Sequence, residues 1–166
     1  MPLRDEVDRL VEAWRRERGD LDLRPMEVLS RVTRLSHHLD RARRQAFAEH
    51  GIESWEFDVL AALRRAGKPY QLSPGRLLKE TLVTSGTMTN RVDRLAARGL
   101  VERLPAPQDR RGVLVRLTTA GRSTVDGALE GLLRREQALL AGLDTAEQER
   151  LTTLLRILVL PFDSET

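Results

Sequence analysis

The chain has 166 residues, of which 40% are hydrophobic and 4% aromatic, and its 28 Lys and Arg against 25 Asp and Glu give a net charge of +3. This length favours one domain, the apolar content excludes wholesale disorder, and the lack of cysteine excludes disulfides, thiolate zinc sites and iron–sulfur clusters. Few aromatic residues argue against a single-strand binder that stacks bases on rings, and without a signal-peptide pattern or a membrane-length apolar run we expect a cytoplasmic protein.

The basic charge is concentrated in the middle of the chain. Residues 55–121 carry a net charge of +6, whereas residues 1–54 are neutral and residues 122–166 carry −3. A basic segment between neutral and acidic flanks favours contact with a polyanion, although an excess of solvated arginine gives the same numbers.

Two helices are expected in the first third of the chain. Residues 3–18 place five apolar side chains on one helical face, namely Leu3, Val7, Leu10, Val11 and Trp14. Residues 25–50 follow with apolar side chains that step by four and three residues, a spacing that makes a continuous packing seam.

The middle of the chain predicts short helices followed by a β-hairpin. The expected helices cover residues 54–67, 73–82 and 84–98, with Ser54 and Thr84 as N-caps. The expected strands cover residues 100–104 and 113–117, with a polar turn at 105–111 and a further very short strand at 70–72. Helices, strand, basic turn and strand in this order predict a winged helix–turn–helix.

Two long helices are expected at the end of the chain. Thr118 or Thr119 opens the first, and a capping box of Asp144 and Glu147 opens the second. Residues 154–160 are apolar nearly all round the helix, whereas a surface helix has a polar face. We therefore expect the last helix to be buried against a second subunit as well as against its own.

The helix at 84–98 carries a polar, cationic stripe. Its members share one face: Thr87, Asn90, Arg91, Arg94 and Arg98. In the major groove Arg pairs with guanine and Asn with adenine, and hydroxyls near a helix N-terminus suit phosphate oxygens. The candidate DNA-binding residues are Ser85, Thr87, Thr89, Asn90, Arg91 and Arg94 on this helix, and Arg110 and Arg111 in the wing turn, which suits a narrow minor groove. The plainer alternative is a set of solvated arginines on an amphipathic helix.

Several motifs in this region resemble the MarR family of transcription regulators. They are Glu56-Phe57-Asp58-Val59-Leu60, residues 83–95, Gly99-Leu100-Val101-Glu102-Arg103 and residues 109–118, in the order and spacing of the family. The resemblance implies a mostly α fold with a small β-hairpin, and an intertwined homodimer held by its N- and C-terminal helices. It also implies binding to double-stranded DNA at a pseudo-palindromic operator, with the acid of Asp109-x-Arg111 bracing the wing.

Three features together resemble the PecS-like, urate-responsive branch of the family. They are the extra N-terminal helix, the Asp20-Leu21-Asp22 run and Pro25-Met26. That resemblance implies a ligand pocket made of Trp14, Asp58, Arg91 and Arg103. A planar purine anion can stack on an indole ring while two guanidiniums hold its oxygens. Each residue also has a plainer role: Trp14 as a helix anchor, Asp58 as a cap or ion-pair partner, Arg91 as a phosphate contact and Arg103 as an outward strand residue.

The domain organisation expected is one structural domain in three segments. Residues 1–50 supply dimerisation and the wall of the ligand pocket, residues 51–118 form the winged helix–turn–helix, and residues 119–166 form the C-terminal dimerisation helices.

The expected function is a ligand-responsive DNA-binding regulator, a repressor, which a small aromatic anion such as urate releases from DNA. One alternative is a winged-helix architectural protein without a ligand, and another is a winged domain that serves protein–protein contact. Neighbouring His37 and His38 point about 100° apart on a helix, so they are a poor metal-binding pair. We find no GxSxG, P-loop or GxGxxG motif, and expect neither an enzyme nor a cofactor.

Overall fold

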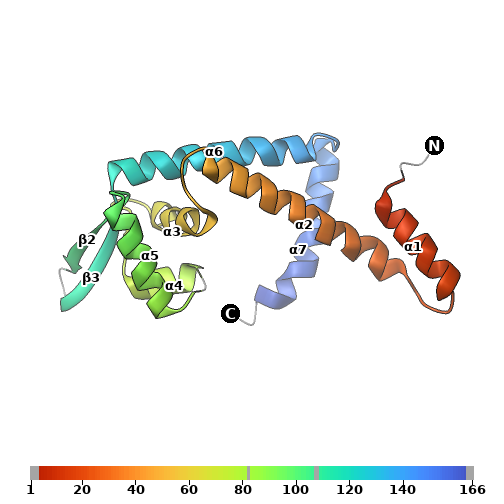
Figure 1. The fold of residues 1–166 in the computed structure, drawn as a ribbon, viewed down its shortest axis with the longest axis horizontal. Coiled ribbons are helices and arrows are strands. Elements are labelled where there is room, and N and C mark those ends of the chain that lie inside the picture. The colour runs from red at the N-terminus through yellow and green to blue at the C-terminus, as the bar shows by residue number, and fades with distance from the viewer. Residues whose placement is uncertain (1–3, 82, 107–108, 164–166) are drawn as a thin grey trace. The chain divides into compact units, whose positions relative to one another are not determined.

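The computed structural model describes residues 4–81, 83–106 and 109–163 (Figure 1). These residues form the helices α1 Glu6–Glu17, α2 Arg24–Ala48, α3 Ser54–Arg65, α4 Pro74–Thr81, α5 Ser85–Ala97, α6 Thr119–Leu140 and α7 Thr145–Asp163, and the strands β1 Gln71–Leu72, β2 Val101–Ala106 and β3 Asp109–Leu117. The predicted mostly α fold with a small β-hairpin is confirmed. The chain divides into two compact units, Met1–Gln45 and Ala46–Thr166.

The first unit contains α1 and most of α2. The Asp5 carboxylate accepts hydrogen bonds from the backbone N–H groups of Val7 and Asp8, while Asp8 accepts the N–H of Asp5, so a capping box begins α1. Val7 and Val11 are buried with Leu23 in a small apolar cluster. The predicted helical stripe is confirmed at these positions, and Leu3 lies outside the described residues.

The second unit is built on a core that α3, α4, α5, α6 and the sheet share. The rings of Phe47 and Phe57 are stacked with their centroids 4.1 Å apart. Around them lie fully buried side chains from each element, including Leu60, Leu63, Leu77, Met88, Leu95, Val115 and Val125. Burial of this many apolar groups holds α5 firmly on the domain.

The sheet has three antiparallel strands in the order β1-β3-β2. The wing is longer than expected, because residues 105–106 belong to β2 and residues 109–111 to β3, so the predicted polar turn at 105–111 is wrong in extent. Pro105 pairs with Val113 and Ala106 with Asp109, with a register shift between these pairs. Strands pair through backbone hydrogen bonds, so the pairing can continue through polar residues. Proline is tolerated in β2 because β2 is an edge strand.

The helix starts mostly follow the sequence expectations. Thr118 caps α6 by accepting the N–H of Gly121 at 3.0 Å, and the Asp144–Glu147 capping box is present at 2.9 Å in both directions. The expected cap at Ser54 is wrong by one residue. Glu53 has the extended N-cap backbone, and the Glu56 carboxylate accepts its N–H at 2.9 Å.

Helix α7 leaves its apolar side chains open in the single chain. No residue of α7 is buried among those the structure describes. The large apolar side chains of its residues 154–160 are between 39% and 63% exposed. The expected burial against the rest of its own subunit is therefore not found. None of the described helices is long and apolar enough to cross a membrane.

Candidate nucleic-acid interface

Helix α5 has one buried apolar face and one exposed polar face. Met88, Val92 and Leu95 are at most 2% exposed and fix the helix on the core. On the other side, five of the predicted DNA-contacting residues are exposed, namely Ser85, Thr87, Thr89, Asn90 and Arg94, while Arg91 is half-buried. The separation of faces that the sequence predicted is therefore present. It leaves hydroxyl, amide and guanidinium groups available at the surface.

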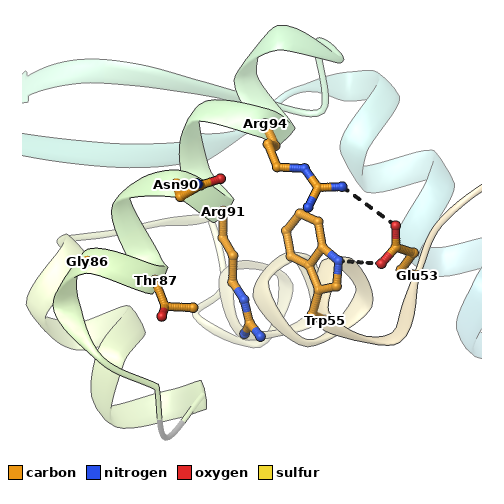
Figure 2. Close-up of a pocket in the computed structure, with 7 residues that line it drawn as sticks. All are labelled: Glu53, Trp55, Gly86, Thr87, Asn90, Arg91 and Arg94. Atoms are coloured by element: carbon orange, nitrogen blue, oxygen red, sulfur yellow. Dashed lines mark hydrogen bonds and ion pairs between the residues drawn. The ribbon is translucent and has the colours of Figure 1, made fainter.

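A tryptophan from the first turn of α3 lies below Arg94 and beside Arg91 of α5 in the view of Figure 2. The guanidinium carbon of Arg94 is 4.7 Å from the centroid of the Trp55 ring, and that of Arg91 is 5.4 Å away. The indole N–H of Trp55 donates to the Glu53 carboxylate at 2.7 Å, and the same carboxylate lies 3.6 Å from Arg94. Both cations thus share one aromatic ring, and Arg94 also has an acidic neighbour.

These side chains line a hollow of about 590 Å³ against α5. Its walls are Glu53, Trp55, Gly86, Thr87, Asn90, Arg91 and Arg94 (Figure 2). Glu53 and Trp55 are not among the site residues expected from the sequence. The signal available was that Trp55, one of only two tryptophans in the chain, lies off the inward-facing positions of its helix. A large aromatic side chain off the core face points to a surface role.

Arg98, which the spacing placed on the stripe, makes structural contacts instead. Its guanidinium forms an ion pair with Glu56, which is 3% exposed, and donates to the carbonyl oxygen of Gly51 at 2.7 Å. A buried carboxylate needs a charged partner to offset its lost hydration. Arg98 therefore ties the end of α5 to the start of α3.

The four residues expected to bind the ligand are distributed over four elements. Trp14 lies on α1 in the first unit and is 45% exposed, in contrast to Val7 and Val11 on the same helix. The other three lie in the second unit: Asp58 is exposed on α3, Arg91 lies over Trp55, and Arg103 on β2 donates to Asp93 at 2.6 Å. The two guanidiniums of the expected pocket therefore have different partners.

The wing residues Arg110 and Arg111 lie at the start of β3. Their side chains, and that of Asp109, are outside the part of the chain that the structure describes. Across the described residues, no three His, Asp or Glu side chains gather as a metal site would require.

Comparisons with known proteins agree with this geometry. A model of the MarR family matches residues 50–112. The chain is 37% identical to the HTH-type transcriptional regulator PecS of Dickeya dadantii (strain 3937) over 150 residues, which cover 90% of each chain.

Solved structures agree as well. A mutant MarR from E. coli complexed with operator DNA superposes with a TM-score of 0.67 at 32% identity, covering 84% of this chain and 99% of that one. Bordetella bronchiseptica BpsR, whose DNA binding is regulated by 6-hydroxynicotinic acid, superposes with a TM-score of 0.64 at 30% identity, covering 79% and 91%. The chain belongs to the MarR family of DNA-binding transcription regulators.

Proposed function

We propose that this regulator is a homodimeric repressor that binds a pseudo-palindromic operator and leaves it when a small aromatic anion, such as urate, binds. The observation that carries the proposal is the surface of α5. Its large apolar residues are buried, and polar and cationic side chains remain on its open face.

Recognition of bases by α5 follows from the side chains on that face. Asn90 can bond an adenine edge and Arg94 a guanine edge, since both offer paired groups with the right spacing in the major groove. Ser85, Thr87 and Thr89 lie in the first part of α5, where hydroxyls and free backbone N–H groups suit phosphates. Arg110 and Arg111 would place a cation in the minor groove from the wing.

Dimerisation is supported by the apolar surface that the single chain leaves open. Besides α7, helix α2 exposes Val28, Leu29, Val32 and Leu35 by 42% to 55%. Exposed apolar surface of this extent marks an association site. Half-sites about 34 Å apart would require a two-fold dimer to hold its two α5 helices about one DNA turn apart.

The ligand is proposed to bind to Trp14, Asp58, Arg91 and Arg103. Trp14 offers a partly exposed indole ring for stacking, and Arg103 could exchange Asp93 for the oxygens of an anion. The similarity to BpsR, whose DNA binding is regulated by 6-hydroxynicotinic acid, supports this ligand class. Because Arg91 also lies on α5, a ligand that engages it would change the helix that meets DNA.

A fluorescence anisotropy titration tests the proposal, with a duplex from upstream of the protein's own gene and a random duplex of equal length. We expect the double variant Asn90→Ala/Arg94→Ala to lose at least about 10-fold in affinity, since each base contact contributes about 1–3 kcal/mol. Arg134→Ala, which removes an exposed arginine of α6, is the matched control.

The ligand is tested separately in the same assay. Millimolar urate should release the wild-type protein, and Trp14→Ala and Arg103→Ala should bind DNA without responding. If urate does not release the wild-type protein from DNA, urate is not the ligand, while the proposal of DNA recognition is unaffected. Equal binding to both duplexes would favour the architectural alternative.

A further inference from the structure

The first turn of α3 contacts α5 directly below its DNA-facing arginines. We propose that Trp55 is a positioning residue for DNA recognition, which presents the guanidiniums of Arg91 and Arg94 to the duplex, and that Glu53 holds Arg94 until DNA replaces it. This inference rests on the proposed function, in which α5 enters the major groove.

The ring of Trp55 supports both cations at once. Arg94 and Arg91 lie 4.7 and 5.4 Å from its centroid, within the range of cation–π attraction. A guanidinium above an aromatic face keeps its N–H donors at the edge of the stack, where a phosphate or a guanine can accept them. Both arginines would otherwise lose side-chain freedom on binding DNA, so a platform that orders them beforehand lowers the cost of association.

The ring itself is held by one hydrogen bond and by packing against the core. Its N–H donates to Glu53 at 2.7 Å, and Glu53 is the N-cap residue of α3, whose own N–H is bonded to Glu56. Glu56 is in turn paired with Arg98 at the end of α5. The platform is therefore tied to the same helix whose arginines it supports.

Glu53 is suited to a temporary contact with Arg94. Their closest atoms are 3.6 Å apart, and the side chains are 63% and 58% exposed. Exposed pairs of this kind are weak, so a phosphate or a base edge can take over the guanidinium without a large opposing cost. The carboxylate then stands near a polyanion, which opposes binding modestly.

A double-mutant cycle between Trp55 and Arg94 tests the proposal by anisotropy, on the upstream and random duplexes described above. Trp55→Ala should weaken binding to the upstream duplex about 5- to 10-fold and binding to the random duplex less. The reason is that recognition of a base edge needs a guanidinium in a fixed orientation, whereas contact with a phosphate does not. Trp55→Phe, which keeps a ring, should restore affinity to within about 2-fold of wild type. In an Arg94→Ala background, Trp55→Ala should cost about 2-fold or less.

The outcomes separate this inference from the proposed function. If Arg94→Ala leaves DNA binding intact, recognition by α5 is wrong and the platform with it. If Arg94→Ala weakens binding and Trp55→Ala costs the same with or without Arg94, only the positioning role is wrong. Thermal unfolding of each variant checks that a loss of affinity is not a loss of fold.

Glu53→Gln gives a second, independent test. The amide oxygen can still accept the Trp55 N–H, while the charge that holds Arg94 is removed. We expect about 2- to 3-fold tighter binding at low salt, with no such gain for Glu130→Gln, a like change at an exposed position of α6. Weaker binding by Glu53→Gln at unchanged stability would contradict the proposed exchange.

Discussion

At the scale of single residues, the arginines of α5 have two kinds of partner. Arg98 is bound to a carboxylate that is 3% exposed, whereas Arg94 is 58% exposed and 3.6 Å from a carboxylate that is itself open to solvent. Removing the first cation leaves Glu56 buried and charged, while removing the second leaves its partner hydrated. The same residue type on one helix therefore serves structure at one position and an outside partner at another.

Arg98→Ala is expected to lower the free energy of unfolding by about 2–3 kcal/mol, somewhat below the usual cost of breaking a buried pair because the Arg98 side chain is 42% exposed. Arg94→Ala is the matched control and should cost about 1 kcal/mol or less. Urea unfolding measures both. Equal losses for the two variants would contradict the separation of roles.

Asp5 gives a pH-dependent test in the first unit. Hydrogen bonding to Arg31 lowers the pKa of the Asp5 carboxyl below its ordinary value of 3.8. Because the folded pKa lies below the unfolded one, the stabilisation is present above pH 3.8 and is lost as the pH falls through the lowered pKa. We expect Arg31→Gln to raise the pKa of Asp5 towards 3.8, as followed by an NMR titration. A carboxyl that titrates alike in both proteins would show that this ion pair does not form.

At the scale of elements, the start of α6 is packed tightly against the wing. A methyl group at Gly121 would lie 1.9 Å from the backbone oxygen of Leu100, so an alanine there forces the start of α6 away from the residue that precedes β2. We expect Gly121→Ala to destabilise the fold by about 1–3 kcal/mol. Gly75→Ala in α4, with no neighbour within 4 Å of the added methyl, is the control and should leave the melting temperature unchanged or slightly raised, because alanine favours a helix more than glycine does. Similar melting temperatures for both variants would mean that α6 and the wing are not packed this closely.

The helices and the hairpin were predictable because their signals are local. Periodicity separated Met88, Val92 and Leu95 from the polar side of α5, and capping residues marked most helix starts. The role of Arg98 was not predictable, because its partner Glu56 lies 42 residues earlier in the chain. Trp55 was missed for the same reason. Its contacts with Arg91 and Arg94 arise only when α3 and α5 pack together.

At the scale of the whole molecule, binding to a two-fold operator requires a second subunit. The apolar side chains of α7 remain open, and burial of such surface favours association. We expect Ile157→Asp/Leu158→Asp to convert a dimer to an 18.8 kDa monomer by light scattering after size exclusion, and to weaken DNA binding strongly. Thr152→Asp, at an exposed polar position of the same helix, is the control. A wild-type protein that is monomeric at micromolar concentration would contradict the homodimer.

The central claim is that the open face of α5 recognises DNA sequence. Anisotropy with the upstream duplex, with and without an excess of random duplex, measures it most directly when wild type is compared with Asn90→Ala/Arg94→Ala. We expect wild type to prefer its upstream duplex by roughly 1,000-fold or more, and the double variant to lose at least about 10-fold of that preference. A double variant that retains the preference of the wild type would contradict the account.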